Sequence, residues 1–343
     1  MASEKLYAGA GAITPPPVTM SRGPLPGFTA SRLGKRSTPS ARCASPLTRF
    51  GRAMKPYLFV LPAVALLAFW CYKPLLQTVS LAFDRWSMVP GTSPTFVGLQ
   101  NFTQLLSNKD FGPAVANTIF YTVGMLPFSV VIPLLLAVAT QDVSPRAKKI
   151  YRAIFFIPMI MAPVTTGTIF QWLCAPGTGL VNQLLAALGL VQAGTSFFSD
   201  PNLARVIILL ITGWKMMGFS TLLMSAALTG INGEYYEAAK LDGANAFQRF
   251  RDITLTMISP TIMLLIMMSL LFSSQWTFAS IDVLTQGGPY GMSTNIYYLM
   301  YRFAFNDMNV GLSAAAAIMF MVVFGLIALI LQRINKRLSF YDN

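Results

Sequence analysis

Six apolar segments, separated by polar stretches, constrain this chain more than any other feature. They lie near residues 57–83, 115–139, 151–174, 204–229, 260–281 and 310–331. Each is long enough to supply the roughly 20 residues that cross a hydrocarbon core about 30 Å thick. Only 11% of the side chains are charged, whereas about 25% is usual in a soluble domain. We therefore predict an all-α fold, a polytopic membrane helix bundle with six spanning helices.

The distribution of Lys and Arg predicts the orientation of these helices, because cytoplasmic segments carry an excess of both. Nineteen of the 25 fall on the side that holds the two termini if the N-terminus is cytoplasmic, and four fall on the other side. The remaining two, Lys73 and Lys215, lie within apolar segments. Both termini are therefore expected to face the cytoplasm.

The ends of the chain differ in composition from the apolar part. Residues 1–55 are rich in Pro, Ser, Gly and Arg and contain nine Lys or Arg against one acid, Glu4, which predicts a basic disordered cytoplasmic tail. An organellar transit peptide and a start codon assigned too early are alternatives. The membrane domain is expected at 56–338, and a short C-terminal tail at 339–343.

The composition argues against several classes of function. The chain has no histidine, and its three cysteines form no CxxC pair, so neither a metal site nor a nucleophile with a histidine base is indicated. The net charge of +13 could suggest nucleic acid, but the basic residues follow membrane topology instead of forming a patch with interleaved aromatics. An intramembrane enzyme would need convergent acids, bases or metal ligands, which the spans do not offer.

One long polar interruption, Glu234 to Pro260, separates two of the apolar segments in the second half of the chain. Asn232 can cap a first short helix, and Gly243 can end it. Asn245, with Gln248 three residues later, can form a capping box at the start of a second helix. The pattern predicts a helix, a hinge and a helix that dock on a partner protein, the alternative being an amphipathic helix on the membrane lipid.

This stretch resembles the EAA motif of the permease subunits of ABC importers, in its carbohydrate uptake branch. The motif is carried by Glu237-Ala238-Ala239, Gly243, Ile253 and Leu255, while Thr256 stands where the motif has proline and Pro260 matches a further proline common in that branch. The resemblance implies a coupling helix that inserts into an ATP-binding subunit. Its expected coupling residues are Glu237, Ala238, Ala239, Asp242, Gly243 and Arg249.

The flanking residues are similar to those of maltose and glycerol-3-phosphate type permeases. Trp214-Lys215 precedes the motif, and Leu284-Thr285-Gln286-Gly287-Gly288-Pro289 follows it. The resemblance implies a bacterial plasma membrane protein that works with an ATP-binding subunit dimer, a second homologous permease and an extracytoplasmic solute-binding protein. Gly287, Gly288 and Pro289 are the expected binding-protein contact.

No phosphate-binding loop of the form G-x-x-x-x-G-K-[ST] occurs in the chain, so ATP must be bound and hydrolysed elsewhere. The chain is accordingly expected to be a transporter subunit rather than an enzyme, with no cofactor of its own, and with ATP and Mg²⁺ held by the partner subunit. A scaffold without transport activity is a further alternative.

Lys215 lies near the middle of its apolar segment, where a charge is costly unless it faces water, a partner or a ligand. We expect it to face the translocation pathway and to attract an oxygen-rich or anionic solute, although snorkelling or a structural pair with a carbonyl is an alternative. Trp214, Gln275, Trp276 and Ser280 are further pathway candidates. The predicted solute is a glycerol phosphate derivative, either glycerol-3-phosphate or a glycerophosphodiester, and the alternative is a neutral sugar such as maltose or trehalose.

Overall fold

The computed structural model describes residues 57, 59–141 and 143–338. The predicted tails, 1–55 and 339–343, lie outside the described residues. The packing described below belongs to the described residues from 63 onward.

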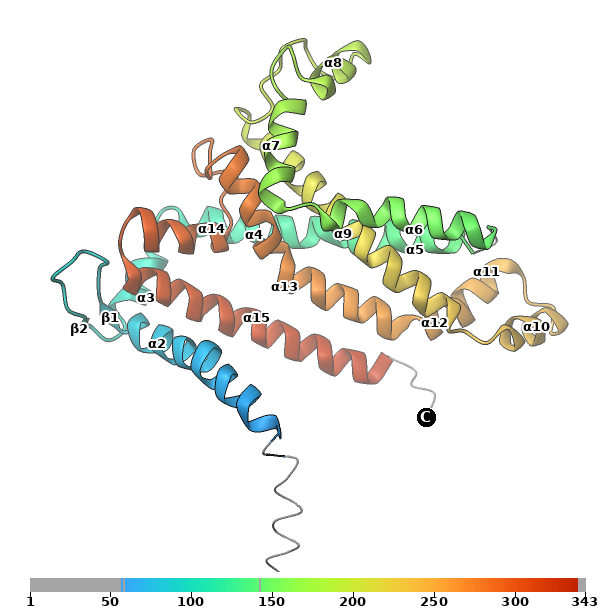
Figure 1. The fold of residues 1–343 in the computed structure, drawn as a ribbon, viewed down its shortest axis with the longest axis horizontal. Helices are drawn as coiled ribbons and strands as arrows, with labels where there is room; N and C mark the ends of the chain where they lie inside the picture. Colours follow the sequence, from blue (N-terminus) through green and yellow to red (C-terminus); the bar gives the residue numbers. More distant parts are fainter. Residues whose placement is uncertain (1–56, 58, 142, 339–343) are drawn as a thin grey trace, which may run out of the picture. The chain divides into compact units, whose positions relative to one another are not determined.

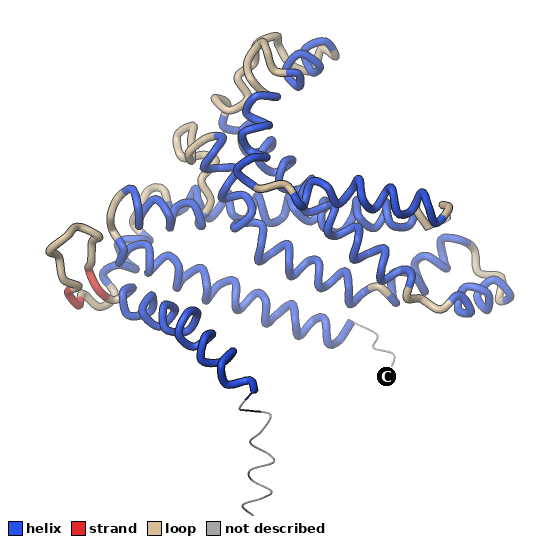
Figure 2. The backbone as a smooth tube through the Cα atoms, viewed as in Figure 1, coloured by secondary structure: helices blue, strands red, loops and turns tan. Residues whose placement is uncertain are grey.

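Helices dominate the described residues, as Figures 1 and 2 show. Five are long and apolar enough to cross a membrane: Phe59–Ala82, Phe111–Ala139, Pro201–Thr229, Ser259–Leu284 and Val310–Asn335. The first contains a π-helical turn η1 (Ala68–Tyr72) and α2 (Lys73–Ala82), and the second runs through α4 (Phe111–Leu126), η2 (Pro127–Val131) and α5 (Ile132–Ala139). The others are α9 (Pro201–Thr229), α13 (Ser259–Leu284) and α15 (Val310–Leu338). The predicted all-α membrane bundle is confirmed.

The segment expected to cross as one helix at 151–174 is broken. It consists of α6 (Pro145–Ile160) and α7 (Pro163–Leu173), which meet at an angle of 95°. Met161 and Ala162 are extended, with ψ of 134° and 136°. The ring of Pro163 disfavours the helical conformation at Ala162, the residue before it. The described residues therefore contain six spans only if this bent pair is counted as one.

Helix α9 lies at the centre of the packing, with half of its most apolar window buried. Small residues let its neighbours approach, as is usual between membrane helices. A Cβ on Gly218 would lie 2.0 Å from the carbonyl oxygen of Phe155 in α6, and one on Gly213 would lie 2.5 Å from the ring of Phe128 in η2. On its other side α9 packs against α13, and their contact includes Ile211 and Ile281.

Shorter elements lie in the connections. The long first connection holds the two-stranded antiparallel hairpin of β1 (Asp84–Arg85) and β2 (Thr95–Phe96), drawn red in Figure 2, and α3 (Gln100–Leu106). Later connections hold α8 (Leu180–Ala187), α14 (Ile296–Tyr301) and η4 (Arg302–Asn306). Between α9 and α13 the chain forms α10 (Gly233–Leu241), α11 (Ala246–Arg249), η3 (Phe250–Thr254) and α12 (Leu255–Met257).

Candidate coupling and translocation sites

The first helix of the predicted coupling stretch begins and ends where the sequence indicates. The Asn232 side-chain oxygen accepts a hydrogen bond from the Glu234 amide at 3.1 Å, which satisfies one of the free donors at the start of α10. The helix ends at Leu241, and Gly243 follows with a φ of +77°. This left-handed conformation suits glycine and turns the chain toward the second helix.

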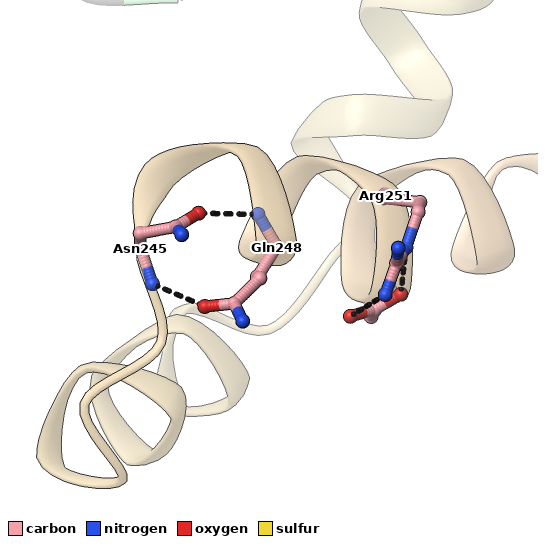
Figure 3. Close-up of polar contacts among 4 residues, drawn as sticks. Asn245, Gln248 and Arg251 are labelled. Atoms are coloured by element: carbon pink, nitrogen blue, oxygen red, sulfur yellow. Dashed lines mark hydrogen bonds and ion pairs between the residues drawn. The ribbon is translucent and has the colours of Figure 1, made fainter.

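The second helix opens with the predicted capping box, which Figure 3 shows. The Gln248 amide donates to Asn245 Oδ1 at 2.9 Å, and the Asn245 amide donates to Gln248 Oε1 at 2.8 Å. The helix continues through η3, where Arg251 and Asp252 form an exposed ion pair at 2.6 Å. Hydrogen bonding to Arg251 lowers the pKa of the Asp252 carboxyl below its ordinary value.

Two side-chain hydrogen bonds link parts of the coupling stretch to one another. The hydroxyls of Tyr236 and Thr254 share a hydrogen bond of 2.9 Å. Across the hinge, Arg249 donates to the Ala244 carbonyl at 2.7 Å, so the predicted coupling residue Arg249 braces the turn at Gly243.

None of the side chains of α10 is buried. Leu241 is 90% exposed and Phe247 is 69% exposed. Large apolar side chains this open beside a carboxylate are typical of a surface that a partner protein covers. Of the predicted coupling residues, four are exposed and two are half-buried; the exposed ones are Glu237, Ala238, Asp242 and Gly243, and the others are Ala239 and Arg249.

Thr256, which replaces the motif proline, lies inside α12. Its carbonyl accepts a hydrogen bond from the Ser259 hydroxyl at 2.8 Å. The spanning helix α13 begins at Ser259, with Pro260 in its first turn, where the missing proline N–H is not needed. The chain therefore enters this span at Pro260.

A cavity of about 390 Å³ lies where the α6–α7 break meets α9 and α13. Four of the five predicted pathway residues line it, namely Lys215, Gln275, Trp276 and Ser280. Trp214 does not line it; its ring packs edge-on against Phe170 at 5.9 Å between centroids. The roles of these residues in transport stay predictions, but the fold brings four of them to one place.

Lys215 is nearly buried, with 8% of its surface exposed. Its ammonium group donates a hydrogen bond of 2.6 Å to the carbonyl of Met161, at the break between α6 and α7. This carbonyl belongs to a helix end and has no acceptor role within α6. The hydrogen bond to Met161 fits the alternative in which Lys215 pairs with a carbonyl. Its place in the cavity lining fits the alternative in which it faces the pathway. The two alternatives are therefore compatible with each other.

The glycines expected to contact a binding protein shape the loop Thr285–Asn295. Gly287 is buried with a φ of +83°, and a Cβ there would lie 2.6 Å from Thr294 Oγ1. Gly288 and Pro289 are half-buried, and the Gly288 carbonyl accepts from Ser293 Oγ at 2.6 Å. The exposed tip of the loop is Tyr290, at 96% exposure.

Residues in α4 anchor this loop. Asn117 Nδ2 donates to the carbonyls of Met292 at 2.7 Å and Thr294 at 2.9 Å, and the Tyr121 hydroxyl donates to the Ser293 carbonyl at 3.1 Å. Sequence reasoning did not single out Asn117 or Tyr121. The available signal was an amide side chain in an apolar helix, which requires a hydrogen-bond partner when it is buried.

Comparison with known proteins matches residues 42–339 to one family, described as the inner membrane component of binding-protein-dependent transport systems. The chain belongs to this family. The permease is 30% identical over 269 residues to the probable ABC transporter permease protein YurN of Bacillus subtilis, which covers 78% of this chain and 91% of that protein. It is 29% identical to the sn-glycerol-3-phosphate transport system permease protein UgpA of Pectobacterium atrosepticum, and the match covers 85% of this chain and 97% of that protein.

Solved structures give the same assignment. The permease superposes with a TM-score of 0.74 and 27% identity on a chain of a bacterial ABC transporter involved in the import of the acidic polysaccharide alginate, covering 85% of this chain and all of that one. A second alginate transporter structure, in complex with a periplasmic protein that holds an alginate pentasaccharide, matches with a TM-score of 0.75 and 26% identity. The permease is thus a multi-pass transporter subunit, and the ATPase resides in a partner subunit.

Proposed function

We propose that this permease imports an anionic, hydroxyl-bearing solute, of which a glycerol phosphate derivative such as glycerol-3-phosphate or a glycerophosphodiester is the specific candidate. The observation that carries the proposal is the position of Lys215, a nearly buried cation on the wall of the cavity between α9 and α13. A buried cation in a membrane span is retained where it serves a ligand, a partner or a pathway. UgpA relatives act on glycerol-3-phosphate and the structural neighbours on an acidic polysaccharide, so both groups handle anionic, oxygen-rich solutes.

We infer that the coupling stretch connects the cavity to ATP hydrolysis in the partner subunit. The coupling stretch joins the C-terminal end of α9 directly to the N-terminal end of α13, and these two helices contribute Lys215 and Ser280 to the lining of the cavity. In our proposal an ATP-binding subunit dimer seats on Leu241, Phe247 and Glu237. Closure of that dimer moves the ends of α9 and α13 and opens the cavity alternately to the two sides of the membrane.

The proposal also assigns an orientation and two further partners. The coupling stretch and both termini face the cytoplasm, following the distribution of Lys and Arg. The loop Thr285–Asn295 then faces the other side, where its exposed Tyr290 contacts the loaded binding protein. A second homologous permease closes the pathway against the exposed side of the cavity.

Import of a neutral sugar is the second candidate. It is favoured by Trp276 and Gln275 on the cavity wall, because an aromatic ring and an amide are suited to stack on and hydrogen-bond a sugar. Lys215 would then serve only to hold the Met161 carbonyl.

The experiment that separates the candidates uses the cognate binding protein and the reconstituted importer. The compounds retained by the purified binding protein are identified first, and their ATP-dependent uptake into proteoliposomes is then measured. The proposal expects glycerol-3-phosphate or a glycerophosphodiester to be retained and taken up. Uptake of maltose or trehalose, without uptake of either phosphate compound, would overturn it in favour of the neutral sugar.

A further inference from the structure

Helix α7 starts at the wall of the cavity without a cap. Its N-cap residue, Ala162, has no side chain that can accept a hydrogen bond, and Pro163 occupies its first turn. The first amide to bond within the helix is that of Thr166, which donates to the Ala162 carbonyl at 2.9 Å. The amides of Val164 and Thr165 therefore have no acceptor within the helix, and the start of this 11-residue helix carries partial positive charge.

Ser280 presents a hydroxyl to the same cavity from α13. The residue is 5% exposed and lines the cavity, and its hydroxyl makes no hydrogen bond among the described residues. Its oxygen is not one of the fully buried atoms that lack a partner, so it is accessible from the cavity. Serines in membrane helices commonly bond the carbonyl one turn earlier, as Thr277 does toward Ser273 at 2.8 Å, but Ser280 does not, which leaves its hydroxyl available to a bound molecule.

Lys215 faces this point from α9. Its bond to the Met161 carbonyl uses one of the three N–H donors of the ammonium group. Among the described residues that line the cavity, none is acidic, so the remaining charge of Lys215 is not balanced by a carboxylate of the cavity wall. A cation, a hydroxyl and an uncapped helix start thus line one cavity, and none of the described residues that line it is an anion.

We propose that Lys215, Ser280 and the N-terminus of α7 form a subsite for the oxyanion group of the transported solute, a phosphate or a carboxylate. Helix N-termini bind such groups through their free amides, and bonds from an ammonium to an oxyanion are charge-assisted. Gln275 and Trp276, about one turn before Ser280 in α13 and part of the same lining, contact the uncharged, hydroxyl-bearing part. The inference rests on the proposed function and deepens it, because it says which group of the solute the cavity recognises.

Equilibrium binding tests the subsite on the purified complex of permeases and ATPase, without the binding protein. Labelled glycerol-3-phosphate is titrated onto the wild-type complex, the Ser280→Ala variant and the Lys215→Gln variant. Ser269→Ala is the matched control, because Ser269 is on the same helix, is 1% exposed and has an unpartnered hydroxyl, yet does not line the cavity. We expect Kd to rise about tenfold in Ser280→Ala and at least tenfold in Lys215→Gln, the size of one lost hydrogen bond to a charged group.

Competition identifies the recognised group. Inorganic phosphate should displace labelled glycerol-3-phosphate, while glycerol at the same concentration should not. An unchanged Kd in Ser280→Ala, an equal loss in Ser269→Ala, or displacement by glycerol but not by phosphate would each overturn the subsite while leaving import of glycerol-3-phosphate intact. If the wild-type complex neither binds nor imports glycerol-3-phosphate but imports a neutral sugar, the proposed function itself is wrong and the subsite falls with it.

Discussion

Replacement of Asn117 by alanine should loosen the loop Thr285–Asn295 without unfolding the bundle. Asn117 is 2% exposed and donates hydrogen bonds to the carbonyls of Met292 and Thr294, while its own oxygen accepts one from Arg205 at 3.2 Å. Each such bond contributes about 1 kcal/mol net, so losing the two bonds to the loop lowers its opening free energy by about 2 kcal/mol and leaves the two loop carbonyls without their side-chain donor.

Hydrogen exchange measures this loss, because exchange from a locally opening segment follows its opening free energy. About 2 kcal/mol corresponds to roughly thirtyfold faster exchange at the loop amides of Met292 and Thr294, which donate to the carbonyls of Pro289 and Gly291. Asn182→Ala is the matched control, since Asn182 is 1% exposed and holds a different loop through Thr195 and Gly194. Unchanged exchange at Met292 and Thr294 in Asn117→Ala, or an equal rise there in Asn182→Ala, would refute the reasoning.

Two further predictions concern the bundle and the coupling stretch. Gly218→Val should prevent stable packing of α9 on α6, because a Cβ there would lie 2.0 Å from the Phe155 carbonyl oxygen. Gly325→Val is the control and should be tolerated, because a Cβ there meets nothing within 4 Å. The yield of monodisperse protein in detergent compares the two variants, and equal yields would contradict the packing. Asn245→Ala should cost about 1 kcal/mol of local stability by removing the N-cap and so raise amide exchange at Gln248 roughly fivefold; no change there would show that the capping box does not hold α11.

Local chemistry predicted the coupling stretch in detail. The caps at Asn232 and Asn245 and the end of the first helix near Gly243 each depend on residues within about one helical turn. The structure has them all as expected. The assignment of the stretch to a docking role depended instead on the resemblance of its residues to a family motif.

The break between α6 and α7 could not be predicted from prolines alone. Pro158 lies inside α6 and Pro127 and Pro133 lie inside a continuous span, whereas Pro163 follows a break. What differs is tertiary: Lys215, 54 residues away in the chain, supplies a donor to the Met161 carbonyl that the break frees. The spacing of residues in the sequence does not predict a contact between such distant residues.

The cavity residues and Asn117 also show how far sequence alone can predict a site. Lys215 drew attention because a charge in an apolar segment requires a reason, and the structure places it on a cavity wall with Gln275, Trp276 and Ser280. Its neighbour Trp214 points instead to Phe170, a difference that one helical step of 100° produces. Asn117 carried a comparable signal, but its partners lie about 175 residues later and only the fold brings them together.

The central claim is that the stretch between α9 and α13 couples the permease to an ATPase partner. The most direct test is co-purification of the ATPase subunit, together with ATP-driven solute uptake, in the Glu237→Lys variant. Asp307→Lys, a charge reversal at an exposed site in the connection between α14 and α15, is the control. The account predicts that Glu237→Lys stays in the membrane but releases the ATPase and loses uptake, while Asp307→Lys retains the ATPase. An ATPase that stays bound and drives uptake at the wild-type rate in Glu237→Lys would contradict it.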